Sequence, residues 1–312
     1  MVSGSAEGCL KMAPVAYIFP GQGSQYVGMG KDMYEKSDVA RSLFKKADSI
    51  LGISLSRICF EGPEDVLRQT ENTQPAIFVH SVILTKLLRH GDAEMAAGHS
   101  LGEYSALVYA GALAFEDGLR LVRLRGELMQ RAGTVEKGTM AAILGLEAKV
   151  VDEICLAASQ RDVVQSANFN SPGQIVISGS VEGVRKAGEI AKTRGAKLVK
   201  ELVVSGAFHS PLMQSARDGL REGLARTTIN EARIPVYANV TGKGVRNPEN
   251  IRFLLEQQLT NPVRWEESIK NMIADGAKKF IEIGPGKVLQ GLVKRIDASM
   301  DATSIDKYGD IF

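Results

Sequence analysis

The sequence has few of the residues that mark redox, metal-binding or disulfide-stabilised proteins. Its 312 residues include only three cysteines, Cys9, Cys59 and Cys155, which are far apart and form no metal-binding or redox motif. An odd number of widely spaced cysteines favours unpaired thiols in a reducing compartment. We therefore expect no disulfide framework, no metal site and a cytoplasmic location.

Long apolar segments are also missing. Residues 1–12 contain no apolar core of the length found in secretory signals, and we interpret them as a loose extension. The richest apolar stretch, 76–88, is interrupted by His80, Ser81 and Lys86. No stretch approaches the ~18 apolar residues that a membrane helix needs, so we expect no membrane partner.

The charge balance excludes one further class of protein. The 38 basic and 36 acidic residues leave a net charge of +2, too small for a general nucleic-acid binder, whose affinity comes mostly from neutralised phosphates. Aromatic residues make up only 6%, whereas glycine is abundant at 32 residues. Abundant glycine together with 44% hydrophobic residues fits an α/β protein with many tight turns.

The order of apolar runs and turns is typical of a parallel sheet with helices. An apolar run at 15–19 ends in Pro20-Gly21, and a short strand at 94–97 leads into Gly98 and a helix at 101–109. Strand, tight glycine turn and helix form the usual βα unit. Further helices are expected at 33–51, 75–89 and 116–132, and further strands at 235–239 and 280–283.

Residues 138–203 follow a different pattern, which we interpret as an inserted subdomain. The expected elements are strands at 139–144, 163–168, 174–178 and 197–203, with helices at 148–158 and 181–194. Their βαββαβ order is the ferredoxin-like arrangement. We therefore predict a core at 13–136 and 205–298, a small subdomain at 137–204, and terminal extensions at 1–12 and 299–312.

The segment Gly98-His99-Ser100-Leu101-Gly102 matches the G-x-S-x-G pattern. Glycines two residues before and after the serine permit an abrupt turn from strand to helix, which holds the hydroxyl exposed at a helix N-terminus. There, free N–H groups and the helix dipole favour a developing oxyanion. A glycine-flanked helix cap is the structural alternative, but the predicted strand and helix around Ser100 favour a nucleophile.

A serine nucleophile needs a base, and the chain offers four histidines. His80 and His90 have structural explanations in one apolar helix, and His99 adjoins Ser100 at a turn where neighbouring side chains diverge. This leaves His209 as the candidate base, with a structural loop histidine as the alternative. No aspartate with convincing context lies between Ser100 and His209, which favours a Ser–His dyad whose imidazole is oriented by an amide or carbonyl.

The glycine loop at 19–25, Phe-Pro-Gly-Gln-Gly-Ser-Gln, follows the first strand. It fits neither the phosphate-binding nor the dinucleotide-binding pattern. We interpret it as a tight loop that donates backbone N–H groups. Gln22 would supply one oxyanion donor and Leu101 the other.

Arg125 is the most informative charged residue. At ~100° per residue, it lies on the apolar face of its helix with Leu121, Val122 and Met129. A buried cation is costly unless it is paired. Its partner is either a core carboxylate or the free carboxylate of a substrate held by the guanidinium fork, and a carboxylated acyl group such as malonyl fits the second case.

Taken together, these motifs resemble those of the malonyl-CoA:acyl-carrier-protein transacylase family of fatty-acid synthesis. The resemblance extends from Pro14 to about Ile296. It rests on seven segments in the family's order: F-P-G-Q-G-S-Q at 19–25, G-H-S-L-G-E at 98–103, R-G-x-x-M at 125–129, N-x-N-S-P-G-Q at 168–174, G-A-F-H-S at 206–210, Q-x-x-N-P-V at 258–263 and E-I-G-P-G-K at 282–287.

The resemblance implies a fold, a reaction and a set of site residues. The fold would be a hydrolase-like parallel sheet core with the inserted ferredoxin-like subdomain. Malonyl would pass from malonyl-CoA to the phosphopantetheine thiol of acyl carrier protein through an ester on Ser100, without a cofactor. The implied roles are His209 as base, the Gln258 carbonyl as its orienter, Gln22 and Leu101 as oxyanion hole, Arg125 as carboxylate ligand, Met129 and Phe208 as acyl-pocket lining, and Asn168 as a contact at the mouth.

Three other functions remain open at this point. A serine esterase or thioesterase would use the same elbow, but Arg125 and the missing triad acid argue against it. A non-catalytic carrier-binding protein is disfavoured by the intact Ser100, His209 and Arg125. Malonyl loading for polyketide synthesis would leave nearly the same residues at the site, so the sequence does not separate it from fatty-acid synthesis.

Overall fold

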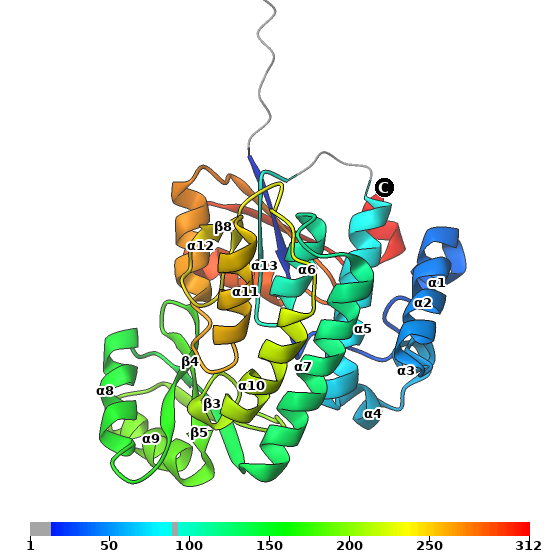
Figure 1. Ribbon diagram of the computed structural model, residues 1–312. Helices are drawn as coiled ribbons and strands as arrows, with labels where there is room; N and C mark the ends of the chain where they lie inside the picture. Colours follow the sequence, from blue (N-terminus) through cyan, green and yellow to red (C-terminus); the bar gives the residue numbers. More distant parts are fainter. Residues whose placement is uncertain (1–13, 89–92) are drawn as a thin grey trace, which may run out of the picture.

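A six-stranded, mostly parallel sheet forms the centre of the larger part of the molecule in the computed structural model (Figure 1). The structure describes residues 14–88 and 93–312. Every neighbouring pair is parallel except the last hairpin. The strand order is β10 (Asp301–Ile305), β9 (Lys279–Ile283), β1 (Val15–Phe19), β2 (Met95–Gly98), β7 (Val236–Tyr237) and β8 (Gly244–Val245).

Helices cover both faces of this sheet. Successive side chains of β1 point to opposite faces and so belong to two different apolar clusters. Tyr17 and Phe19 belong to one apolar cluster, whereas Ala16 and Ile18 belong to another on the opposite face. The second cluster includes residues of α12 (Trp265–Ala274) and α13 (Val288–Ile296). The first cluster takes in residues of α1 (Lys31–Lys36), α2 (Asp38–Leu51), α3 (Leu55–Glu61), α4 (Glu64–Arg68), α5 (Thr70–Leu87), α6 (Gly102–Tyr109), α7 (Phe115–Val135), α10 (Gln214–Ala225) and α11 (Pro248–Gln257).

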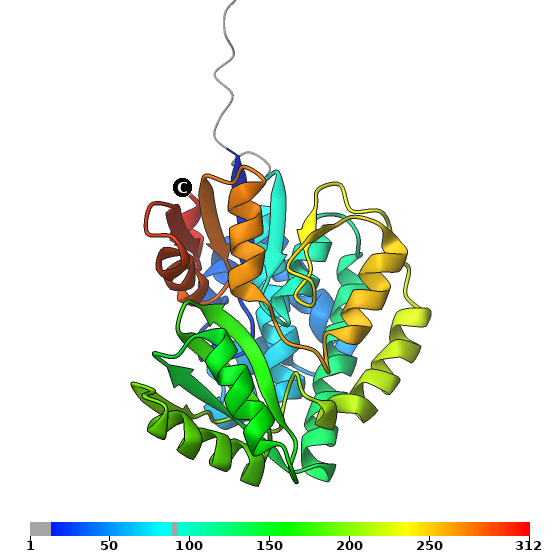
Figure 2. The same ribbon diagram turned by 90° about the vertical axis from the view of Figure 1, so that its left-hand side faces the viewer.

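A second, antiparallel sheet lies beside the first, with two helices packed on it (green in Figure 2). It has its own apolar cluster. The elements follow the chain order β3 (Gly138–Leu144), α8 (Ala148–Ala158), β4 (Val164–Ser171), β5 (Gln174–Ser180), α9 (Val181–Thr193) and β6 (Leu198–Glu201). The spatial order β4-β5-β3-β6 is that of a ferredoxin-like unit, so the predicted fold class is confirmed.

Backbone hydrogen bonds at the end of β4 join the small sheet to the larger part of the molecule. The Phe169 N–H donates to the Val263 carbonyl at 2.9 Å, and the Val263 N–H donates to the Ala167 carbonyl at 2.8 Å. Val263 is buried in the core cluster against α12. This seam fixes the small sheet against the loop that leads from α11 to α12.

Two of the expected helices have different limits. The helix predicted at 33–51 is divided at Ser37, which is extended and accepts a hydrogen bond from the Ala40 N–H as the N-cap of α2. The helix predicted at 75–89 begins at Thr70. Its first turns bury Thr73 and Gln74, and because these residues are polar, apolar periodicity could not reveal them.

The prediction of a C-terminal extension at 299–312 is wrong. Residues 301–305 form the edge strand β10 in register with β9, and Ile311 in the short helix η2 (Tyr308–Ile311) is 2% exposed. The Asp306 carboxylate accepts a hydrogen bond from the Tyr26 hydroxyl at 3.0 Å. This segment therefore completes the sheet and holds the loop after β1.

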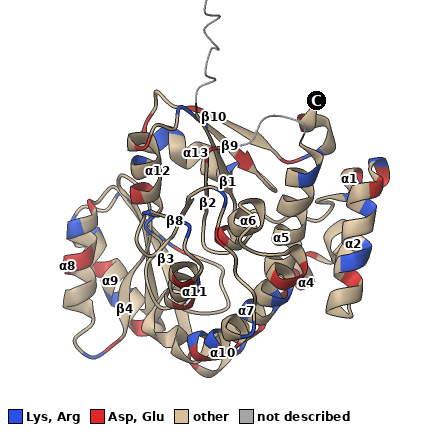
Figure 3. Ribbon diagram, turned by 45° about the horizontal axis from the view of Figure 1, so that its top comes forward, with Lys and Arg blue, Asp and Glu red and all other residues tan. Residues whose placement is uncertain are grey.

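The predictions for Cys9, His90 and the extension at 1–12 lie outside the described residues. Cys59 and Cys155 are free, buried thiols. In the described part of the chain, no helix has the length and apolarity to cross a membrane. The same residues contain no group of three or more His, Cys, Asp or Glu placed to hold a metal ion. Acidic and basic side chains are interspersed over the helices (Figure 3).

We expect truncation after residue 298 to lower the melting temperature by roughly 10 °C or more. Removing β10 uncovers the edge of β9 and takes the buried side chains of Ala302 and Ile311 out of the core. Thermal unfolding followed by circular dichroism measures the change. A chain that ends at residue 307 keeps β10, so its melting temperature should fall by less. Equal melting temperatures for the full chain and the chain ending at 298 would contradict this prediction.

Candidate active site

Ser100 sits at a turn that only glycine neighbours permit. It joins β2 to α6 in the left-handed conformation, with φ 51°. A Cβ on Gly98 would lie 1.9 Å from the Gly102 carbonyl carbon, and a Cβ on Gly102 would lie 2.1 Å from the Phe19 oxygen. The glycines at both ends of the elbow are therefore required by close backbone contact, as the motif predicted.

His209 lies directly against this serine. Its Nε2 is 2.9 Å from Ser100 Oγ, and its Nδ1 is 2.8 Å from the Gln258 carbonyl oxygen. Because a carbonyl only accepts, Nδ1 must carry the proton, which leaves Nε2 free to accept the serine proton. The loop holds the ring in place through a left-handed backbone at φ 57° and through the amide of Gln165, which donates to the His209 carbonyl at 2.8 Å.

The surroundings of His209 keep it neutral. Burial and the neighbouring Arg125 charge lower the pKa of His209 to about 3, against the opposing effect of the Gln258 carbonyl. Neither ring nitrogen bonds a carboxylate. The structure thus agrees with a Ser–His pair oriented by a backbone carbonyl.

Arg125 reaches the same point from α7. Its side chain is buried, at 1% exposed. Nη2 donates to Ser100 Oγ at 3.0 Å and to Gln258 Oε1 at 2.9 Å, and Nη1 donates to Gln74 Oε1 at 2.8 Å. These partners are neutral oxygens, and no direct ion pair with a carboxylate of the described residues accompanies them. Burial lowers the pKa of Arg125, and the nearby Glu103 charge opposes this effect.

Met129 and Phe208 lie beside these residues in the large apolar cluster. Met129 is one turn of α7 beyond Arg125, and its Sδ accepts a hydrogen bond from the Gln74 amide at 3.3 Å. Phe208 directly precedes His209 and is 6% exposed. The contact of both side chains with an acyl group stays a prediction.

The loop with Gln22 is pressed against the elbow. A Cβ on Gly21 would lie 2.4 Å from the His99 carbonyl oxygen. The Ser100 N–H donates to Asn239 Oδ1 at 2.7 Å, so it cannot serve an oxyanion. Among the residues that the structure describes, the N–H groups of Gln22 and Leu101 have no acceptor. Their role as oxyanion donors stays a prediction.

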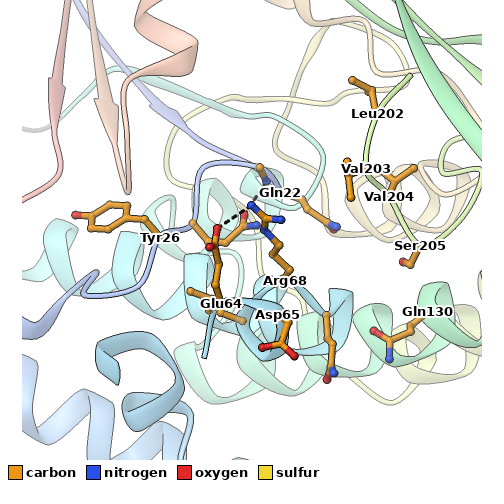
Figure 4. A pocket seen from close by; sticks show the side chains of 14 residues that line it. Gln22, Tyr26, Glu64, Asp65, Arg68, Gln130, Leu202, Val203, Val204 and Ser205 are labelled. Carbon is orange, nitrogen blue, oxygen red and sulfur yellow. Dashed lines mark hydrogen bonds and ion pairs between the residues drawn. The ribbon is translucent and has the colours of Figure 1, made fainter. Parts of the chain in front are cut away.

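A groove of 740 Å³ adjoins the site at Gln22 (Figure 4). Ser205, four residues before His209, lies on the other side of it, and its hydroxyl is 2.8 Å from that of Thr70. Val203 on the rim is 95% exposed. The other lining residues come from the loop after β1, from α4, from α7 and from the segment after β6. Because Gln22 belongs to the loop that contacts the elbow, the groove lies beside the site.

With this geometry described, comparison with known proteins identifies the family. The model of the acyl transferase domain matches residues 16–307. The malonyl CoA-acyl carrier protein transacylase of Bacillus subtilis is 46% identical over 94% of this chain and 94% of its own length. That of Escherichia coli K12 is 43% identical over 95% and 97%. The chain belongs to the malonyl-CoA:acyl-carrier-protein transacylase family.

Solved structures of this family have the same fold. The acyl carrier protein S-malonyltransferase from Vibrio cholerae has a TM-score of 0.93 at 42% identity, covering 96% of this chain and 99% of that one. A malonyl-transacylase solved in complex with its type II polyketide synthase acyl carrier protein has a TM-score of 0.93 at 40% identity, covering 96% and 98%. The chain is therefore similar to members of the family over nearly its whole length.

One predicted member of the site lies elsewhere in this transacylase. Asn168 is buried in the seam where β4 meets Val263 of the loop between α11 and α12. Asn170, two residues further on, makes the contact with the elbow through Oδ1, which is 2.8 Å from His99 Nε2. The structure thus brings Asn170 rather than Asn168 to the nucleophile turn, and substrate contact by Asn168 stays a prediction.

Sequence reasoning missed three buried polar residues at the site and the role of the Gln258 side chain. Gln74 bonds Arg125, and Asn239 bonds both the Ser100 N–H and the Gly98 carbonyl. Glu103 accepts a hydrogen bond from the Gln258 side-chain amide at 2.8 Å. For Gln258 only the backbone carbonyl had a predicted role. A polar residue within an apolar element could have indicated such a contact, because buried polar side chains rarely lack a hydrogen-bond partner.

We expect acylation of Ser100 to depend little on pH between about 5.5 and 8. With its pKa near 3, His209 stays unprotonated throughout, whereas a histidine with the ordinary pKa of ~6.5 would be about tenfold depleted in its basic form at pH 5.5. Single-turnover loading from acetyl-CoA, whose acyl group has no carboxylate, measures this. A tenfold loss of rate toward pH 5.5 would contradict the prediction.

Proposed function

We propose that this transacylase moves malonyl from malonyl-CoA to the phosphopantetheine thiol of acyl carrier protein by a ping-pong reaction through a Ser100 ester. Membership of the family supports the activity. The observation that carries the site assignment is that Arg125 Nη2 and His209 Nε2 both lie within hydrogen-bonding distance of Ser100 Oγ, at 3.0 and 2.9 Å. A base and a carboxylate ligand thus meet at one nucleophile.

In the first half-reaction, Ser100 Oγ attacks the thioester carbonyl while His209 Nε2 takes its proton. The tetrahedral oxyanion lies on the N–H groups of Gln22 and Leu101. Collapse breaks the C–S bond, and the proton on Nε2 goes to the departing sulfur of coenzyme A. The products are a malonyl ester of Ser100 and free coenzyme A.

In the second half-reaction, the thiol of the carrier protein enters by the same groove. His209 takes the thiol proton as the sulfur attacks the ester carbonyl, and it returns that proton to Ser100 Oγ when the C–O bond breaks. Acyl transfer of this kind consumes no electrons and no further reactant. We therefore propose that no cofactor takes part.

Arg125 gives the reaction its acyl specificity. In the free enzyme its Nη2 donates to two neutral oxygens, Ser100 Oγ and Gln258 Oε1. A malonyl carboxylate offers a charged, bidentate acceptor, which binds a guanidinium more strongly than neutral oxygens do. Because Arg125 is buried, an acyl group without a carboxylate leaves it without this compensation.

The alternatives differ in what they predict for the chain. A hydrolase would need water to reach the ester, whereas the Arg125–carboxylate pair favours a malonyl group held for transfer. A role in polyketide synthesis has one supporting observation, the similarity to a transacylase solved with a type II polyketide synthase carrier. Comparing kcat/KM for loading of a fatty-acid carrier and of such a carrier decides between the two roles.

The buried, unpaired thiols of Cys59 and Cys155 fit a reducing compartment. We accordingly propose the cytoplasm as the place of action.

Intact-protein mass after brief mixing with malonyl-CoA tests the proposed intermediate. We expect a malonyl adduct on the unaltered chain and none on Ser100→Ala, because the ester oxygen is removed. Acetyl-CoA should give little adduct. Release of coenzyme A without an adduct would favour a hydrolase, and an adduct that survives in Ser100→Ala would overturn the site.

We expect Arg125→Ala to lower the ratio of kcat/KM for malonyl-CoA over acetyl-CoA by roughly 100-fold, since a charged bidentate contact is lost for malonyl alone. Steady-state transfer to carrier protein measures both rates. Arg123→Ala is the matched control, because Arg123 lies on the same helix but pairs with Glu127 at 2.5 Å and with the Glu71 carbonyl at 3.0 Å. An unchanged ratio in Arg125→Ala would count against the proposal.

A further inference from the structure

Glu103 is a buried carboxylate close to the nucleophile that the reaction above does not use. It lies in the first turns of α6, three residues after Ser100, and is 3% exposed. Its Oε2 accepts from the Asn239 N–H at 3.0 Å and from Gln258 Nε2 at 2.8 Å. Both of these partners are amides rather than a cation. A buried carboxylate without a direct counter-charge is costly, so its position calls for an explanation.

Gln258 connects this carboxylate to both functional side chains. It is fully buried. Its Nε2 donates to Glu103 Oε2 at 2.8 Å and to the Ser100 carbonyl at 3.1 Å, and its Oε1 accepts from Arg125 Nη2 at 2.9 Å. Its backbone carbonyl accepts from His209 Nδ1. The side chain therefore serves Arg125, while the backbone serves His209.

The partners of this amide permit only one orientation. An ionised carboxylate can only accept hydrogen bonds, and a guanidinium can only donate them. The Gln258 NH₂ group must therefore face Glu103, and Oε1 must face Arg125. If the carboxylate became a neutral amide, the Gln258 NH₂ group would keep the Ser100 carbonyl at 3.1 Å but lose its charged acceptor. The Gln258 amide would then be held less firmly, and so would the Arg125 guanidinium that donates to its Oε1.

We infer that Glu103 is a positioning residue for acyl selectivity: it orients the Gln258 amide, whose oxygen aims Arg125 at the position of the substrate carboxylate. This inference rests on the proposed role of Arg125. Burial raises the pKa of Glu103 to about 7, although Asn239, Gln258 and Arg125 all oppose the rise. The carboxylate is therefore largely ionised at about pH 8, where the orientation that it imposes is strongest.

Glu103 has a second contact that a test must separate from the first. Through Oε2 it holds the Asn239 N–H, and the Asn239 side chain bonds both the Ser100 N–H and the Gly98 carbonyl. Damage to this contact would disturb the elbow itself and lower loading of every acyl group. Misdirection of Arg125 would lower loading of malonyl alone, so the malonyl-to-acetyl ratio distinguishes the two effects.

The experiment compares kcat/KM for malonyl-CoA and acetyl-CoA, with transfer to carrier protein at about pH 8, in Glu103→Gln, Arg125→Ala and the double variant. We expect Glu103→Gln to lower the malonyl-to-acetyl ratio roughly tenfold, as loss of a buried charged hydrogen bond does. In the double variant the ratio should equal that of Arg125→Ala, because Glu103 acts through Arg125.

Glu282→Gln is the matched control. Glu282 is also a fully buried carboxylate, but it lies in β9 and bonds the Gln290 N–H of α13 at 2.8 Å. Its neutral variant should lower stability and leave the malonyl-to-acetyl ratio unchanged. A similar fall of the ratio in Glu282→Gln would overturn the inference, because any buried carboxylate would then have the effect.

The outcomes separate the inference from the function on which it rests. If Arg125→Ala lowers the ratio and Glu103→Gln does not, or lowers both rates equally, the inference is wrong and the function stands. If Arg125→Ala leaves the ratio unchanged, both fail. Should Glu103→Gln not fold, Gln258→Met tests the same link, because it removes the amide and keeps the carbonyl that orients His209. A tenfold lower ratio supports the inference, and an unchanged ratio overturns it.

Discussion

The close approach of three backbone segments at the nucleophile elbow is the constraint on which the active site depends. Gly98 touches Gly102, and Gly102 touches the end of β1. Between these glycines Ser100 adopts the left-handed conformation, and its hydroxyl contacts His209 and Arg125. The same contact brings the loop after β1, and with it Gln22, to the edge of the elbow. One steric condition thus places Ser100 and the loop that carries Gln22 beside each other.

Around this elbow, amide groups rather than carboxylates contact the functional side chains. A backbone carbonyl orients His209, and side-chain amides of Gln74 and Gln258 accept from Arg125. The guanidinium therefore has no carboxylate in direct contact, and the Glu103 charge reaches it only across the Gln258 amide. This arrangement costs stability, and it is the physical basis of the proposal that Arg125 binds the carboxylate of the acyl group.

The local elements could be predicted because their signals are local. The apolar run at Val15–Phe19 and the periodicity of Ala148–Ala158 gave strand and helix with the limits that the structure has. The C-terminal strand at Asp301–Ile305 could not be recognised in the same way. Its burial pattern alternates only weakly, and it becomes a strand because β9 offers a free edge. Pairing of this kind depends on contacts between distant segments.

The sequence by itself determined the residues that can react, namely a serine between glycines, one histidine without a structural role and an arginine on an apolar face. Only the tertiary structure decided how they are held. Gln258, Asn239 and Glu103 come from segments far apart in the chain, and hydrogen bonds between them form only where the folded sheet edges and helix ends meet. Periodicity reports which side of an element is buried; it does not report which buried polar groups will face one another.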